Sequence, residues 1–135
     1  MSEKQKLLIV DDSELNRDIL KEILGSRYDY MEAENGTQAI QILEVHPEID
    51  LMLLDINMPQ MNGFQVLEHM RELQWIDEVP VVMISSEESV EIMRKAYDLG
   101  ITDYISRPFD AVIVKKRVQN TLALYANQKR LVNVV

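Results

Sequence analysis

Short apolar runs alternate with longer amphipathic stretches along most of the chain. Each run is bounded by polar or turn-forming residues, which is typical of a strand that is buried on both faces. We expect five such strands, at residues 6–10, 28–34, 49–55, 79–85 and 102–106. The other stretches have the spacing of amphipathic helices, at residues 12–24, 35–46, 64–73 and 87–100, and a long helical pattern follows Asp110.

The first of these helices, residues 12–24, carries apolar residues at helical spacing. We expect its buried face to hold Leu15, Ile19, Leu20, Ile23 and Leu24. Gly25 follows at the position where glycine commonly ends a helix. Asp12 or Ser13 can cap the other end, because both side chains accept hydrogen bonds from free backbone N–H groups.

The alternation of strand and helix predicts the fold class. Strands that are separated by helices form a parallel α/β sheet covered on both faces, a doubly wound arrangement. Right-handed crossovers leave few strand orders open. A length of 135 residues predicts one such domain.

The unusual polar residues follow the carboxyl ends of the expected strands. Asp11 and Asp12 follow the first strand, Asp55 ends the third, Ser85 ends the fourth, and Arg107 follows the fifth. In parallel sheets the ligand site lies outside these carboxyl ends. We therefore expect these side chains to meet at one edge of the sheet.

Three carboxylates at this edge would repel one another by several kcal/mol at short range. Protonation of one of them, or a bound cation, would relieve the repulsion. Asp11, Asp12 and Asp55 offer only oxygen ligands, which suit Mg²⁺ better than zinc. Taken alone, the pair Asp11 and Asp12 could be a helix cap and its solvated neighbour. The addition of Asp55 favours the magnesium site.

The other side chains at this edge suit a phosphate group. Ser85 offers a hydroxyl, and Arg107 offers a guanidinium that can bridge phosphate oxygens. A carboxylate beside a cation and a phosphate site suggests an acyl phosphate on aspartate. Asp55 is the expected nucleophile, because it comes from a central strand between the Asp pair and the Ser and Arg side chains.

Four motifs in the chain resemble the receiver domain of two-component response regulators. They are LIVDDSELNR (residues 8–17), LLDINMPQMNGFQVL (53–67), VPVVMISS (79–86) and KAYDLGITDYISRPFD (95–110). Their order and spacing match the family pattern over about residues 5–125. The resemblance implies a flavodoxin-like fold with strand order 2-1-3-4-5.

The resemblance also implies a phosphorylation site. Asp55 would be phosphorylated by a sensor histidine kinase or a phosphotransfer protein. Mg²⁺ would be bound by the side chains of Asp12 and Asp55, by the backbone carbonyl of Asn57, and by Asp11 largely through water. Asn57 and Glu87 would flank the phosphate and orient the water that removes it. The domain would catalyse only its own phosphorylation and dephosphorylation, so we expect no separate enzymatic turnover.

Further residues take family roles by the same resemblance. Ser85 would close on the phosphate, and Tyr104 would be the aromatic switch coupled to it. Pro108 would hold the loop after Arg107 in a cis turn. The family normally has lysine where this chain has Arg107, and arginine is longer, planar and forked.

Two other functions are weighed against the phosphorylated receiver. One is a receiver-like interaction module that Arg107 keeps unphosphorylated. The other is a Mg²⁺-dependent phosphohydrolase with an aspartyl nucleophile. The hydrolase needs an acid–base aspartate two residues after Asp55, and that position holds Asn57.

Composition limits the partners and the cellular compartment that the protein can have. The net charge of −9 argues against electrostatic binding of nucleic acid by the domain. No apolar run approaches the ~20 residues of a membrane span, and the polar N-terminus MSEKQK is unlike a signal peptide. The absence of cysteine suits a reducing compartment, so we expect a cytoplasmic protein.

The end of the chain differs chemically from the rest. Residues 111–135 hold 5 basic residues and no acidic one, whereas the first 110 residues carry 23 acids and 9 bases. We assign residues 1–125 to the receiver domain and residues 126–135 to a helical extension that starts a linker to an output domain. Positions at heptad-like spacing are Val114, Val118, Thr121, Tyr125, Gln128, Val132 and Val135.

This tail resembles that of receivers fused to cyclic-dinucleotide enzymes with GGDEF or HD-GYP outputs. Phosphorylation would shift the face that is formed by the helix at 87–100, the strand at 102–106 and the last helix. We expect a homodimer, if one forms, to use this face or the C-terminal helix.

Overall fold

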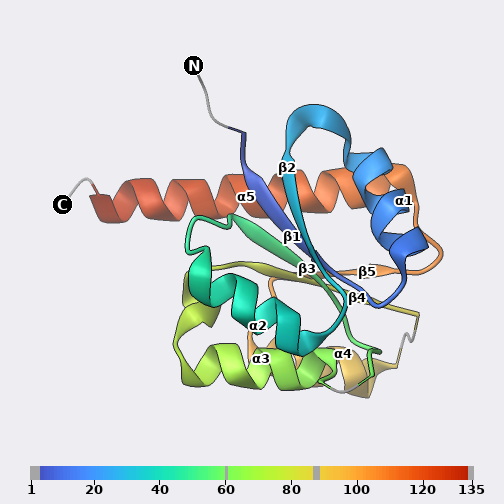
Figure 1. Cartoon of the computed structure of the whole chain (residues 1–135). Helices are drawn as coiled ribbons and strands as arrows, with labels where there is room; N and C mark the ends of the chain where they lie inside the picture. Colours follow the sequence, from blue (N-terminus) through green and yellow to red (C-terminus); the bar gives the residue numbers. More distant parts are fainter. Residues whose placement is uncertain (1–3, 60, 87–88, 134–135) are drawn as a thin grey trace.

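A computed structural model of the chain describes residues 4–59, 61–86 and 89–133 (Figure 1). The strands are β1 (Lys6–Val10), β2 (Asp29–Ala33), β3 (Leu51–Asp55), β4 (Val81–Ser85) and β5 (Asp103–Ser106). The α-helices are α1 (Glu14–Leu24), α2 (Gly36–Val45), α3 (Gly63–Glu72), α4 (Val90–Leu99) and α5 (Ala111–Asn133). Short 3₁₀ turns, η1 (Gly25–Arg27) and η2 (Trp75–Asp77), follow α1 and α3. Every strand and helix expected from the apolar pattern is confirmed.

The five strands form one sheet in the order β2-β1-β3-β4-β5, and all neighbouring pairs are parallel. This confirms the doubly wound, flavodoxin-like topology with strand order 2-1-3-4-5. β1 and β3 lie side by side, with Val10 opposite Leu54. The next residue of each strand is therefore an aspartate, Asp11 beside Asp55, at the carboxyl edge of the sheet.

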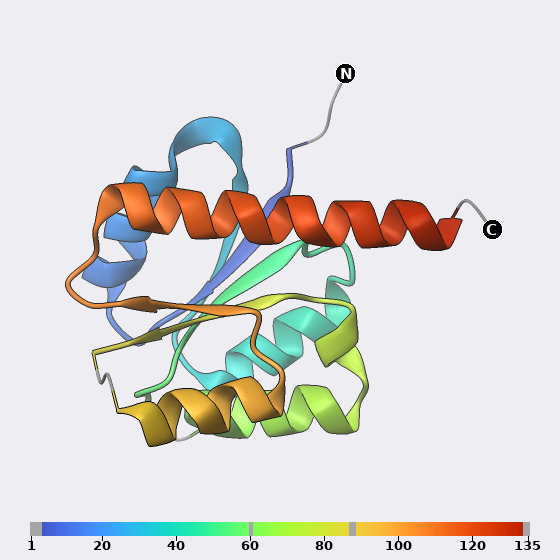
Figure 2. The same cartoon turned by 180° about the vertical axis from the view of Figure 1, so that it is seen from behind.

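Helices cover both faces of the sheet (Figures 1 and 2). Alternate residues of the central strands point to opposite faces, because side chains in a strand have a period of two. Leu8, Met52 and Met83 pack with α2, α3 and α4, while Leu7, Leu53 and Val82 pack with α1 and α5. Burial on both faces explains why these strands are almost uninterrupted apolar runs.

The buried face of α1 differs from the prediction at two positions. Leu15 is 69% exposed, whereas Arg17 is only 8% exposed and lies with Leu20 and Leu24 toward the core. At 100° per residue, Leu15 lies about 180° around the helix from Leu24, and Arg17 lies about 20° from it. The prediction that Leu15 is buried was wrong, because a charged residue occupies the core-facing position in the first turns.

Gly63 brings the start of α3 against the end of β3. A Cβ atom on Gly63 would lie 2.7 Å from the Cα of Ile56 and 2.8 Å from the carbonyl oxygen of Asp55. These are main-chain atoms that cannot move aside, so only glycine fits here. The close approach fixes the loop between β3 and α3 beside Asp55, and Asn62 and Gln65 form a capping box at the helix start.

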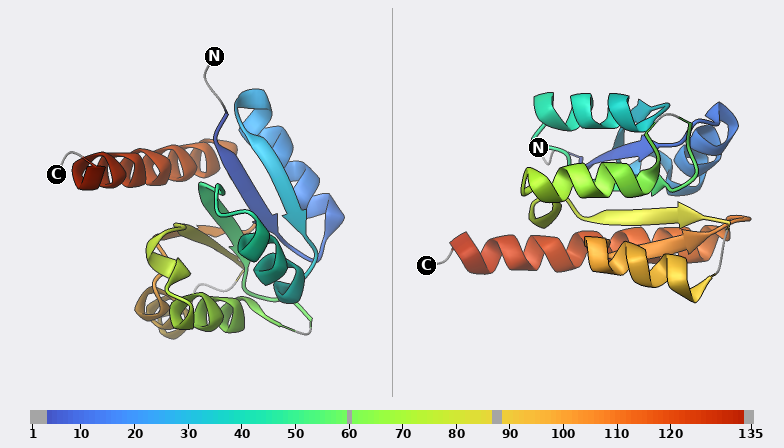
Figure 3. Two further views of the ribbon diagram at one scale, coloured as in Figure 1. Left: turned by 60° about the vertical axis from the view of Figure 1, so that its left-hand side comes forward. Right: turned by 90° about the horizontal axis from the view of Figure 1, so that it is seen from below.

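The last helix, α5, is the longest element. It has 23 residues and continues past the end of the sheet (Figures 1 and 3). The first heptad-like positions, Val114, Val118 and Thr121, are buried in the domain itself. Side chains after Tyr125 and residues 134–135 lie outside the described part, as do the later positions of the pattern. The domain boundary at residue 125 stays a prediction.

Within the described residues, each helix is too short or too polar to span a lipid bilayer.

Candidate functional site: an acidic cluster at the carboxyl edge

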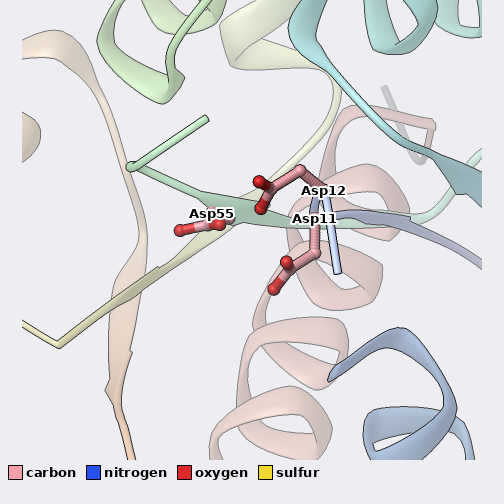
Figure 4. A group of neighbouring side chains, drawn as sticks. All are labelled: Asp11, Asp12 and Asp55. Carbon is pink, nitrogen blue, oxygen red and sulfur yellow. The ribbon is translucent and has the colours of Figure 1, made fainter. Parts of the chain in front are cut away.

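Three carboxylates meet at the carboxyl edge of the sheet, as the sequence predicted (Figure 4). Asp11 and Asp12 follow β1, and Asp55 ends β3. One carboxylate oxygen of each lies within 4.8 Å of an oxygen of the others. Asp11 and Asp55 are buried, whereas Asp12 is exposed.

The surroundings of Asp55 change the pKa of its carboxyl group. Its Oδ1 accepts a hydrogen bond of 3.0 Å from the N–H of Asn57, and its buried Oδ2 has no hydrogen-bond partner. Burial raises the pKa of Asp55 from its ordinary 3.8 to about 6, and the charge of Asp11 adds to the rise. The N–H of Asn57 and the guanidinium of Arg107 oppose the rise of this pKa.

Both carboxylate oxygens of Asp11 are already used. Its Oδ1 accepts a hydrogen bond of 2.9 Å from the N–H of Ser13, and its Oδ2 accepts one of 2.5 Å from Nη2 of Arg107. The side chain is fully buried. Both oxygens of Asp11 are therefore held by hydrogen bonds, whereas Oδ2 of Asp55 has only the 3.2 Å contact with Arg107 and the exposed carboxylate of Asp12 makes no hydrogen bond within the described residues.

Arg107 is the cation of the cluster. Its Nη2 lies between Asp11 and Asp55 and is 3.2 Å from Oδ2 of Asp55. The backbone N–H of Arg107 donates to the carbonyl of Ser85, and its peptide bond to Pro108 is cis, as predicted. Its Nε is buried without a hydrogen-bond partner. The guanidinium thus offsets part of the negative charge of the two carboxylates. Its Nε–H remains available to donate a hydrogen bond to a ligand.

Comparison with known proteins decides the family. The family model of the response regulator receiver domain matches residues 7–119. The chain belongs to the response regulator receiver domain family. The chemotaxis protein CheY homolog of Campylobacter jejuni is 31% identical over 119 residues, which cover 87% of this chain and 92% of that protein.

Two further relatives of this receiver domain are longer proteins. A probable cyclic di-GMP phosphodiesterase of Vibrio cholerae is 32% identical over 127 residues, covering 94% of this chain and 29% of that protein. The crystal structure of a putative two-component system response regulator/GGDEF domain protein superposes with a TM-score of 0.84 at 26% identity. That match covers 91% of this chain and 51% of the other. The similarity in both cases is to a receiver-sized part of the longer protein.

Of the other predicted residues of the receiver domain, Ser85 and Asn57 lie next to Asp55, and Tyr104 lies in β5. Ser85 ends β4, one strand away from Asp55, and is buried. Asn57 is exposed and contacts Asp55 through its N–H. Tyr104 lies in β5, where its carbonyl accepts a hydrogen bond from Nη1 of Arg117, whose guanidinium lies 5.0 Å from the tyrosine ring. Their roles as phosphate contact, metal ligand and switch stay predictions, and Glu87 lies outside the described residues.

The donor set of the receiver domain fits Mg²⁺. Six ligands at about 2.1 Å around an octahedral ion lie about 3–4 Å from one another, and the carboxylate oxygens here lie within 4.8 Å. The buried Oδ2 of Asp55 makes no well-directed hydrogen bond and lies 3.2 Å from the guanidinium of Arg107, so it already has a cationic neighbour and could exchange it for a metal ion. Neither of the two histidines belongs to the cluster, so the site has the character of a hard-cation site.

Sequence reasoning missed one residue beside the cluster. Arg17 of α1 donates a hydrogen bond of 2.6 Å from Nη1 to the carbonyl of Asp11, and one of 2.9 Å from Nε to Glu32 of β2. A signal was available, because Arg17 falls within about 20° of Leu24 and about 60° of Leu20 around the helix. A charged residue at a core-facing position needs buried partners.

Proposed function

We propose that this receiver domain accepts a phosphoryl group on Asp55 from a phosphohistidine, in the presence of Mg²⁺. The donor would belong to a sensor histidine kinase or a phosphotransfer protein. The observation that carries the proposal is the position of Asp55. Its carboxylate ends a central strand, lies within 4.8 Å of the other two carboxylates and has one oxygen whose neighbour is the guanidinium of Arg107 at 3.2 Å, without a well-directed hydrogen bond.

The chemistry is a nucleophilic displacement at phosphorus. A carboxylate oxygen of Asp55 forms a bond to phosphorus while the phosphorus–nitrogen bond of the phosphohistidine breaks. The imidazole leaves with the bonding electron pair and is neutral, because its other nitrogen already carries a proton. The product is an aspartyl phosphate, which water later hydrolyses to free phosphate and the original carboxylate.

The residues that would hold Mg²⁺ are Asp12 and Asp55 by their carboxylates, Asn57 by its backbone carbonyl, and Asp11 through water. When bound, the ion reduces the repulsion between the carboxylates and the phosphoryl oxygens. Asp11 is suited to an indirect role, because Ser13 and Arg107 occupy both of its oxygens.

The phosphate would be held by the residues opposite the acidic pair. Arg107 would exchange its contact with Asp55 for the phosphoryl oxygens, which form strong bidentate pairs with guanidinium groups. The hydroxyl of Ser85 would donate to the same group. Closure of Ser85 would be coupled to Tyr104 and would alter the face formed by α4, β5 and α5.

The output of the domain would be a partner, a second copy bound through the α4-β5-α5 face or through α5, or a fused domain. The two longer relatives carry cyclic di-GMP phosphodiesterase or GGDEF in their names, which supports an output that makes or degrades a cyclic dinucleotide. We place the domain in the cytoplasm with its kinase, and we assign residues 126–135 to the connection with an output domain.

Acetyl phosphate tests the proposal. With MgCl₂, intact-mass spectrometry should detect one phosphoryl adduct on the wild-type protein and none on Asp55→Asn. Chelation of Mg²⁺ with EDTA should also abolish the adduct.

The same experiment separates the alternatives. Absence of any adduct would favour the inert module, for which the observed contact of Arg107 with both buried carboxylates is the supporting observation. Sustained turnover of small phosphate esters would favour the hydrolase.

A further inference from the structure

We propose that Arg17 is a positioning residue for the metal site, because its guanidinium fixes the peptide that joins Asp11 to Asp12. Loss of this contact should weaken Mg²⁺ binding even though Arg17 cannot touch the ion. The inference rests on the proposed function, since it concerns the same Mg²⁺ site.

Arg17 connects three elements of the fold. It lies in α1, its Nη1 donates to the carbonyl of Asp11 at the end of β1, and its Nε donates to Oε1 of Glu32 in β2. The backbone N–H of Asp11 donates to the carbonyl of Ala33, also in β2. The main chain of Asp11 is therefore held at its N–H by the neighbouring strand and at its carbonyl by Arg17.

Asp12 depends on this main-chain anchor. Its carboxylate is exposed, and among the described residues no hydrogen bond or ion pair holds that carboxylate in place. The position of Asp12 is set on one side by the peptide plane that begins with the carbonyl of Asp11, and on the other by the N–H of Ser13, which donates to Oδ1 of Asp11. Rotation of that plane would move the Asp12 oxygens away from Asp55, with which they share the cluster.

The charge of Arg17 is balanced outside the cluster. Glu32 also accepts a hydrogen bond of 2.8 Å from Lys21, which in turn pairs with Asp18. The hydrogen bond from Lys21, and then that from Arg17, lower the pKa of Glu32 against the effect of burial, so this carboxylate stays charged. Arg17 is thus held in place by an ion-pair network that does not use the ligand oxygens.

A purely structural role would not require this residue. An apolar side chain of similar length would fill the space beside Leu20 and Leu24 without the desolvation cost of a guanidinium. Arg17 supplies two donors on separate nitrogens, one for Glu32 and one for the Asp11 carbonyl. The experiment must therefore separate metal affinity from stability.

Isothermal titration calorimetry with MgCl₂ measures the affinity directly. We expect Arg17→Met to raise the Kd for Mg²⁺ about tenfold or more, the range found when partners of metal ligands are removed. Lys21→Met is the matched control. It removes the same charge from the same network but has no contact with Asp11, and it should change the Kd less than twofold.

A second control corrects for stability. Leu43→Ala removes a buried side chain of α2 and destabilises the fold away from the cluster. Its Kd should stay within twofold of wild type, whereas its unfolding midpoint in urea should fall. If Arg17→Met and Leu43→Ala lose comparable stability but only Arg17→Met loses affinity for Mg²⁺, the positioning role is supported.

Several results would overturn the inference. An unchanged Kd in Arg17→Met, or equal changes in Arg17→Met and Lys21→Met, would reduce Arg17 to a structural or general electrostatic role. If Arg17→Met does not fold, Arg17→Gln keeps a side-chain amide donor but is too short to span Glu32 and the carbonyl of Asp11 together, and a Kd equal to that of wild type would refute the inference. A wild-type protein that binds no Mg²⁺ would instead refute the proposed function, and the inference with it.

Discussion

Replacement of Asp55 by asparagine should stabilise the metal-free protein at neutral pH. The carboxyl group of Asp55 is 1% exposed, and burial raises its pKa to about 6 from the ordinary 3.8. The folded state therefore binds a proton more tightly than the unfolded state does. Between about pH 4 and pH 6, stability is lost as pH rises, because folding then opposes ionisation of this group.

The magnitude follows from the two pKa values. Their difference of about 2.2 pH units corresponds to about 3 kcal/mol at 1.36 kcal/mol per unit. Asparagine resembles the protonated carboxyl and avoids this cost, but its amide gives up the contact with Arg107. We expect Asp55→Asn to be about 1–3 kcal/mol more stable than wild type at pH 7.5, and to lose most of this advantage near pH 4.

Urea unfolding, followed by far-UV circular dichroism in EDTA from pH 4 to pH 8, measures the difference. Asp29→Asn is the control, because Asp29 is an exposed carboxyl in β2 and should show little change. Saturating Mg²⁺ should raise the stability of wild type and leave Asp55→Asn unchanged. An Asp55→Asn variant that is less stable than wild type, or whose advantage is the same at pH 4 and pH 8, would refute the reasoning.

Three further variants test the site. Arg107→Met removes the cation between Asp11 and Asp55, so the free energy of unfolding of the metal-free protein at pH 7.5 should fall by about 1–3 kcal/mol in urea. The loss should be smaller near pH 4, and an equal loss at both pH values would contradict this. Gly63→Ala should lose about 2–3 kcal/mol in the same assay, because its Cβ would meet main-chain atoms; wild-type stability would show that the loop can move. Asp12 is exposed, so Asp12→Asn should change the stability of the metal-free protein by less than about 0.5 kcal/mol. The same variant should weaken Mg²⁺ binding at least tenfold in calorimetry, and unchanged binding would exclude Asp12 as a ligand.

Much of the fold was predictable, because burial on both faces leaves a clear signal. The runs around Leu53 and Val82 are apolar at consecutive positions since both faces of the sheet are covered. The carboxyl ends of parallel strands share one edge, so Asp11, Asp12 and Asp55 could be placed together without knowledge of a single distance. The strand order, by contrast, came from the family resemblance.

The contacts of the two arginines were harder to predict. Arg107 lies 96 residues from Asp11 along the chain, and the contact depends on how far a long side chain reaches from a loop. Arg17 was missed because the spacing of apolar residues placed Leu15, and not Arg17, on the buried face of the helix. The angle around α1 was the better guide, since it groups Arg17 with Leu24 whatever the charge.

The length of α5 makes its last turn sensitive to a change in the tilt of the helix. Its first residue, Ala111, follows Arg107 by four positions, and its 23 residues span about 33 Å. Residues up to Leu122 are packed against the domain, so the part of α5 from Leu122 to Asn133 spans about 16 Å, and a tilt of about 5° would displace the last turn by about 1.4 Å. A change in how the first half of α5 packs on the sheet would therefore be passed to the far end of the helix without unfolding any element.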